Sequence, residues 1–111
     1  MKTSAAVLSA ACLLAVAQPA CAADDLKRGE ELLRRDCGAC HATGKAGDSP
    51  RKEAPAFRTL SQRYPIEQLE ESLGEGIMSG HPDMPEFSFD ADDVSAIIAY
   101  LNSIQQPVPK K

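Results

Sequence analysis

Five consecutive residues constrain this chain more than any others: Cys37-Gly38-Ala39-Cys40-His41. Two cysteines separated by two residues, with a histidine directly after the second, are the pattern at which haem is attached covalently. Each thiol can form a thioether with one haem vinyl group, and the imidazole can bind the iron from one side. The motif therefore predicts one haem c, held by Cys37 and Cys40, with His41 as an axial ligand.

Two other kinds of site use the same cysteine spacing. A redox dithiol normally follows a β-strand in a βαβ pattern, and no strand pattern precedes Cys37. A structural zinc site needs four ligands, and the histidines available to complete it are His41 and His81, whose spacings do not match the usual pairs. Haem attachment is the favoured interpretation, with the dithiol and the zinc site as alternatives.

The first 23 residues have the features of a secretory signal peptide. Lys2 gives a positive start, residues 5–17 form an apolar run of 13, and Ala20-Cys21-Ala22 is a small-x-small cleavage site. An uncleaved membrane anchor is the alternative, but a bilayer-spanning helix needs about 20 apolar residues. We expect cleavage after residue 22 or 23, export to the periplasm, and a mature chain that begins near Asp24.

Cleavage would also remove Cys12 and Cys21, so that the mature protein keeps two of its four cysteines, both in the motif. No disulfide could then form, which suits a protein whose thiols take up haem outside the cytoplasm. The expected organisation is a signal peptide over residues 1–23, one domain over residues 24–106 and a flexible tail over residues 107–111.

The periodicity of apolar residues predicts an all-α fold of three to four short helices around the haem. The first helix is expected to be capped by Asp24 or Asp25 and to lead into Cys37. Residues 42–56 and 76–89 are rich in glycine, proline and polar residues, which indicates irregular loops, and a short turn is expected at residues 57–63. The apolar stripe of the first helix consists of Leu26, Gly29, Leu32 and Leu33.

Two further helices are expected in the second half of the chain. The middle one should begin at Pro65, which suits a first helical position, and should be closed by Gly74. The last helix should be capped by Asp90 and ended by Pro107. It has the clearest amphipathic pattern in the chain. Its apolar residues are Val94, Ile97, Ile98, Leu101 and Ile104.

Met84 is the candidate for the second axial ligand of the iron. It lies between Pro82 and Pro85, and each proline fixes its own φ and restricts the residue before it. A thioether on such a stiff segment suits a ligand that keeps one geometry in both oxidation states. Met78 and His81 are the rival ligands, and Met84 could instead be an ordinary core residue.

These features together resemble the small bacterial class I cytochromes c, over nearly the whole length after the signal peptide. The resemblance is carried by Gly29, the motif at residues 37–41, Ala54-Pro55, His81-Pro82-Asp83-Met84-Pro85 and the helix pattern of residues 93–101. It implies an all-α cytochrome c fold with one covalent haem c. A leucine stands at position 33, where many relatives have an aromatic residue.

The resemblance also implies roles for individual residues. It makes His41 the proximal and Met84 the distal ligand of the iron. It makes the Pro55 carbonyl the acceptor of a hydrogen bond from the His41 ring, which orients the ring. It makes Gly29 the point where the first helix approaches the last. No residue is implied to be catalytic.

The resemblance implies that the protein is a soluble electron carrier between a donor and an acceptor complex, monomeric and not an enzyme. The alternatives are a haem c subunit of a larger dehydrogenase or oxidase complex, and a haem protein whose sixth iron site is open to ligands. The formal net charge of −4 argues against nucleic-acid binding. Residues 64–106 carry nine acidic side chains and no Lys or Arg, and this asymmetry could orient a redox partner.

Overall fold

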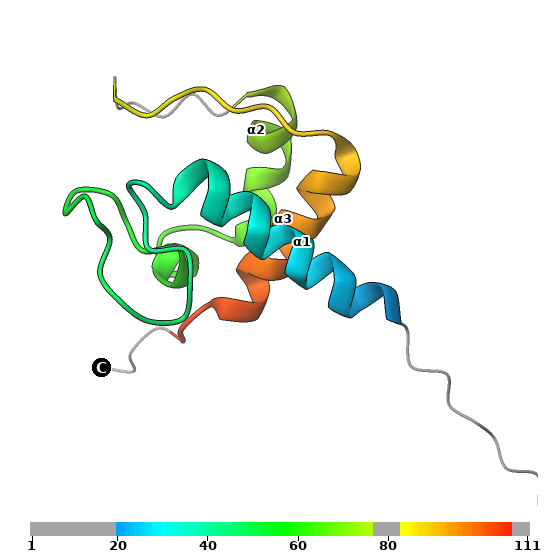
Figure 1. Cartoon of the computed structure of the whole chain (residues 1–111), viewed down its shortest axis with the longest axis horizontal. Coiled ribbons are helices and arrows are strands. Elements are labelled where there is room, and N and C mark those ends of the chain that lie inside the picture. The colour runs from blue at the N-terminus through cyan, green and yellow to red at the C-terminus, as the bar shows by residue number, and fades with distance from the viewer. Residues whose placement is uncertain (1–19, 77–82, 108–111) are drawn as a thin grey trace, which may run out of the picture.

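The computed structural model describes residues 20–76 and 83–107. It contains two longer helices, α1 (Ala20–Cys37) and α3 (Ala91–Ile104), and the short α2 (Leu69–Glu75). Two 3₁₀-helices, η1 (Phe57–Gln62) and η2 (Ile66–Gln68), lie between α1 and α2, and η2 runs directly into α2. No β-strand occurs in these two ranges (Figure 1). The predicted all-α fold is confirmed.

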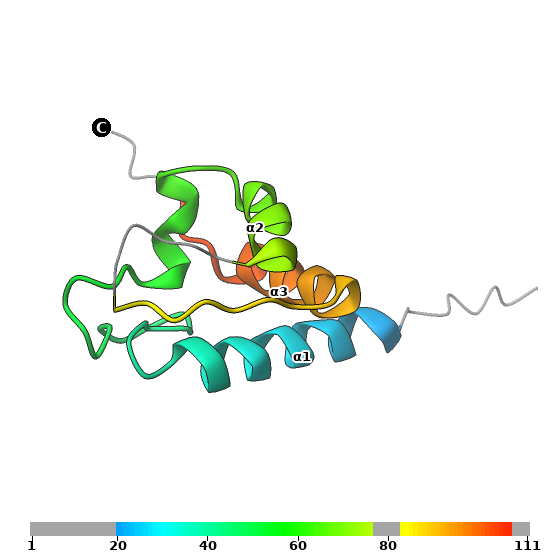
Figure 2. The ribbon, with the colours of Figure 1, turned by 90° about the horizontal axis from the view of Figure 1, so that it is seen from above.

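The fold is organised around the crossing of α1 and α3, which lie against each other in both views (Figure 2). Gly29 is the contact point: a Cβ atom there would overlap the carbonyl oxygen of Ala96 and would lie 2.8 Å from Cβ of Tyr100. Only glycine therefore allows the two backbones to come this close. The predicted approach of the first helix to the last at Gly29 is confirmed.

The core lies between α1, α3 and the short helices. All five apolar residues predicted for the last helix are buried, as are Leu32 and Leu33 of α1. Leu26, which was placed in the same stripe, is 37% exposed. It precedes the crossing at Gly29 by nearly one turn, so α3 does not cover it. The other large core residues are Phe57, Leu60, Ile66, Leu73 and Tyr100.

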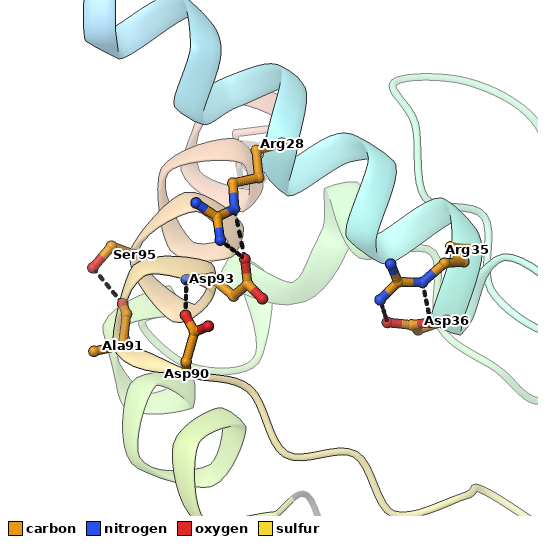
Figure 3. A network of polar contacts seen from close by, with 7 residues as sticks. All are labelled: Arg28, Arg35, Asp36, Asp90, Ala91, Asp93 and Ser95. Atoms are coloured by element: carbon orange, nitrogen blue, oxygen red, sulfur yellow. Dashed lines mark hydrogen bonds and ion pairs between the residues drawn. The ribbon is translucent and has the colours of Figure 1, made fainter.

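The start of α3 is fixed by two carboxylates (Figure 3). The Asp90 side chain accepts a hydrogen bond of 2.8 Å from the backbone N–H of Asp93, which confirms the predicted N-cap. The Asp93 carboxylate forms an ion pair of 2.6 Å with Arg28 of α1. The first turn of α3 is therefore connected to α1 just before the crossing.

Three predicted helix boundaries were wrong. The middle helix was predicted to begin at Pro65, but Pro65 is an extended residue (ψ 137°) that precedes η2, and α2 begins at Leu69. The first helix begins at Ala20, not at an Asp24 or Asp25 cap, because the residues before Asp24 are mostly alanine, the strongest helix former. The middle helix continues through Gly74 and ends at Glu75. Gly76 terminates it, because its φ of +117° is a conformation that residues with a Cβ rarely adopt.

The end of α3 is connected to η1 through one side chain. The amide group of Gln105 donates hydrogen bonds of 2.8 Å to the carbonyls of Phe57 and Leu101. Its amide oxygen accepts one of 2.8 Å from the backbone N–H of Ser61. Gln105 itself is extended, two residues before Pro107, so α3 ends slightly earlier than proline alone would require.

Among the described helices, none combines the length and apolarity needed to cross a bilayer.

Candidate functional site

The two motif cysteines and the histidine lie on one turn at the end of α1. The carbonyl of Cys37, the last residue of the helix, accepts hydrogen bonds from the backbone N–H groups of Cys40 at 3.2 Å and His41 at 2.9 Å. Gly38 allows this turn, because a Cβ at that position would overlap the carbonyl oxygen of Arg34. The local backbone thus holds both thiols close to the imidazole, as attachment of one haem requires.

The His41 ring has a fixed orientation. Its Nδ1 lies 2.8 Å from the carbonyl oxygen of Pro55, the two atoms of the hydrogen bond that the family resemblance implies. A carbonyl can only accept, so Nδ1 carries the proton and Nε2 keeps a free lone pair. The ring also packs against Phe57, with centroids 4.6 Å apart. In the neutral imidazole, Nε2 is therefore the nitrogen that can bind a metal.

The loop after His41 is held at several points. The backbone N–H of Ala42 donates to Oγ of Ser49 at 2.9 Å, and its carbonyl accepts from Phe57 N–H at 3.0 Å. The hydroxyl of Tyr100 donates to the carbonyl of Thr43 at 2.9 Å. Tyr100 also lies beside Gly29 at the helix crossing, so this one residue contacts both α1 and the loop. The sequence signal available for the loop contact was that a buried tyrosine hydroxyl needs a hydrogen-bond partner.

The environment of Cys37 argues against a redox dithiol. Partial burial, with smaller contributions from the charges of Asp36 and Cys40, raises the pKa of the Cys37 thiol to about 11. A thiol that acts in disulfide exchange has a lowered pKa and is present as the thiolate. Within the described residues, no three His, Cys, Asp or Glu side chains gather as metal ligands would. Thioether formation remains the chemistry that suits these two cysteines.

Met84 lies on the extended segment that leads into α3, and its side chain is half-buried. Its neighbour Asp83 forms an ion pair of 2.6 Å with Arg51, in the loop that follows the cysteine motif. The rival ligands Met78 and His81 lie outside the described residues. The structure brings Cys37, Cys40, His41 and Pro55 together. The ligand roles of His41 and Met84 stay predictions.

An all-α fold whose first helix ends in a Cys-x-x-Cys-His turn, with the histidine ring held by a backbone carbonyl, defines a cytochrome c. Comparison with known families agrees with this class. Residues 24–101 match the family described as cytochrome c oxidase, cbb3-type, subunit III, and the chain belongs to this family of cytochrome c domains.

Two characterised relatives are cytochromes c. Cytochrome c-552 of Bradyrhizobium diazoefficiens is 29% identical over 83 residues, which cover 75% of this chain and 78% of that protein. The cytochrome c subunit of the cytochrome bc1 complex of Corynebacterium diphtheriae is 32% identical over 87 residues. That match covers 74% of this chain but only 28% of the longer relative. No solved structure gives a significant match.

Membership of this family settles the cofactor and the general activity. The protein carries covalently bound haem c, and Cys37 and Cys40 fit the attachment motif. Like its relatives it is an electron-transfer protein and not an enzyme. Cys37, Cys40 and His41 fit haem c, because they provide two neighbouring thiols and an imidazole whose free nitrogen is Nε2.

Proposed function

We propose that this protein is a periplasmic one-electron carrier whose haem iron is bound by His41 and Met84. Residues 1–23 serve as the export signal and are removed, residues 24–106 form the haem domain, and residues 107–111 are a tail. When bound, haem c supplies an iron that cycles between Fe(II) and Fe(III). The carrier accepts an electron from one redox complex and delivers it to another. Sequencing of the exported protein is expected to start near Asp24.

The observation that carries the proposal is the contact of 2.8 Å between His41 Nδ1 and the Pro55 carbonyl. A hydrogen bond of this kind orients a ligating imidazole and increases its basicity. Because the acceptor is backbone, and Phe57 packs on the same ring, the imidazole has little freedom to turn. A ligand held in this way keeps its position when the iron changes oxidation state, which favours rapid electron transfer.

Met84 suits the opposite side of the iron for a chemical reason. A thioether is a weak donor, and methionine in place of a stronger axial ligand raises the reduction potential. Pro82 and Pro85 on either side restrict the backbone of this segment. With both axial positions filled, no substrate needs to reach the iron.

The test is the optical spectrum of the ferrous holoprotein before and after carbon monoxide. The wild-type spectrum is expected to stay low-spin and to change only slowly, because Met84 occupies the sixth position. Met84→Ala is expected to bind carbon monoxide at once, whereas Met78→Ala and His81→Ala, the matched controls, should behave like wild type. Immediate binding by the wild type would overturn the proposal in favour of an open site.

A haem c subunit of a larger complex is the second candidate. It is favoured by the match to a bc1 complex subunit and by the family description, which names an oxidase subunit. Purification from the native host separates the two. A carrier is expected to be released with the periplasmic fraction and to elute without a partner during purification. Constant co-migration with an oxidase or bc1-type complex would favour the subunit.

The charges on the described surface indicate how a partner would approach the proposed carrier. Lys45, Arg51 and Lys52 are exposed on the loop that follows the cysteine motif. The exposed acidic residues Glu70, Glu71 and Glu75 lie on α2. We expect partners to dock near the motif with the acidic side turned away, guided by long-range attraction. Electron-transfer rates should then depend on ionic strength, and rates that do not would exclude such guidance.

A further inference from the structure

An ion pair connects the cysteine loop to the methionine segment. Nη2 of Arg51 lies 2.6 Å from Oδ2 of Asp83, and the two residues are 32 positions apart in the chain. Arg51 follows the haem-attachment motif, and Asp83 directly precedes Met84. Their segments, the green loop and the start of the yellow segment, lie on the same side of the molecule in both views (Figures 1 and 2).

Arg51 is held on its own side by the backbone. Its N–H donates to the carbonyl of Cys40 at 3.1 Å, and its carbonyl accepts from Ala54 N–H at 3.1 Å. Glu53 is a weaker second partner, with its carboxylate 3.9 Å from Nε of Arg51. The guanidinium group therefore projects from a backbone position that is tied to a haem-bearing cysteine.

Asp83 transmits this contact to the residue that follows it. Asp83 and Met84 are neighbours, so only ψ of Asp83 and φ of Met84 separate their Cα atoms, and Pro85 restricts the conformation of Met84. Holding the Asp83 carboxylate in place therefore limits where Met84 can move. Contacts run without interruption from Cys40 through Arg51 and Asp83 to Met84.

We propose that the Arg51–Asp83 bridge is a positioning device that keeps Met84 on the iron. This inference rests on the proposed function, in which Met84 is the sixth ligand. Segments with few buried contacts open before the rest of a protein does. The bridge lowers the population of the open form, in which Met84 has left the iron. Both side chains are partly exposed, at 46% and 64%, so the effect is modest, up to about fivefold in that population.

The test is the rate at which ferrous holoprotein binds carbon monoxide, because binding must wait until Met84 dissociates. Arg51→Gln and Asp83→Asn are each expected to raise this rate about two- to fivefold, since loss of the pair frees the segment. The exchanged pair, Arg51→Asp with Asp83→Arg, should restore much of the wild-type rate. The far-red absorption of the ferric iron–thioether bond should weaken in the single variants and recover in the exchanged one.

The matched control is Arg28→Gln, which breaks another ion pair of 2.6 Å between distant segments, far from Met84 in sequence. It should lower stability slightly and leave the carbon monoxide rate unchanged. If Arg51→Gln bound carbon monoxide at the wild-type rate while Met84→Ala bound it immediately, the role proposed for the ion pair would be wrong. The proposed function would then still stand. Wild-type protein that binds as fast as Met84→Ala would overturn both.

Discussion

His41 and Met84 lie on segments that the protein fixes by different means. The loop that carries His41 is held by three partly buried hydrogen bonds: the His41 ring donates to the Pro55 carbonyl, the Ala42 N–H donates to Ser49, and the Tyr100 hydroxyl donates to the Thr43 carbonyl. The segment that carries Met84 is held by two exposed contacts, Asp83 with Arg51 and Ser88 with the Gly74 carbonyl, and by a backbone hydrogen bond from the N–H of Phe89 to the carbonyl of the buried Leu73.

This difference indicates which side of the site yields first. Water competes with exposed hydrogen bonds and ion pairs, so each contributes little, whereas partly buried ones keep more of their strength. The segment that carries Met84 should therefore detach from the rest of the protein while the loop that carries His41 keeps its hydrogen bonds. In the proposed carrier, His41 would be a permanent axial ligand, and Met84 would be one that is stabilised mainly by the fit of its segment.

The largest effect is expected when haem cannot be attached. This case tests whether contacts within the protein alone can hold the loop that carries His41. A double variant, Cys37→Ala with Cys40→Ala, cannot attach haem and should lose most of its fold. The haem domain proposed for residues 24–106 is small, and such a domain seldom has a sufficient core without a cofactor or a covalent cross-link. Far-ultraviolet circular dichroism on heating should show no cooperative transition. A sharp transition would mean that the protein contacts suffice.

The next effect concerns the helix crossing behind the His41 loop. Gly29→Leu should lower the free energy of unfolding by about 3 kcal/mol or more, because its side chain forces α1 away from Ala96 and Tyr100. The control is Gly74→Ala, where a Cβ meets no atom within 4 Å. It should be neutral or stabilising by about 0.5–1 kcal/mol. Urea unfolding of the holoproteins measures both, and equal stabilities would contradict the steric argument.

A smaller effect compares one contact from each side directly. Tyr100→Phe leaves the Thr43 carbonyl without its partner and should lower the free energy of unfolding by about 1 kcal/mol. The carbon monoxide rate should not change. Ser88→Ala removes an exposed contact from the Met84 segment and should do the reverse, raising the rate slightly with little effect on unfolding. If both variants changed both quantities alike, the two sides would not be independent.

The smallest effect depends on pH. A hydrogen bond from Arg35 lowers the pKa of Asp36, the residue before the motif. A carboxyl with a lowered pKa in the folded state stabilises the fold above its unfolded pKa, and this contribution is lost as pH falls through the folded pKa. Arg35→Gln should therefore be slightly less stable than wild type at pH 7, and the difference should vanish once the pH has fallen below the folded pKa of Asp36. A difference that is constant with pH would exclude this origin.

Much of the fold could be predicted because its information is local. The apolar residues of α3 recur with helical spacing, and Asp90 stands three residues before the N–H that it caps. The haem motif is contained in five neighbouring residues. Helix ends were less predictable, because alanine at position 20 and glycine at positions 74 and 76 each permit more than one boundary.

The contacts that complete the site could not be predicted in the same way. Phe57 against His41, Tyr100 with Thr43, and Arg51 with Asp83 join residues that are far apart in the chain. Periodicity and turn signals describe one segment at a time and contain no information on the path of a loop. For this reason the candidate ligands could be proposed from motifs, and Pro55 from the family resemblance, while Phe57, Tyr100 and Arg51 required the structure.

The α1–α3 crossing also sets an order of events during synthesis. Gly29 and Ala96 meet only after most of the chain has been made, so the domain cannot close before the last helix is present. Until then Cys37 lies in solvent, whereas in the closed domain its side chain packs against the core. The interval before the last helix arrives is therefore the time at which the cysteines react most readily, and haem attachment should precede completion of the fold.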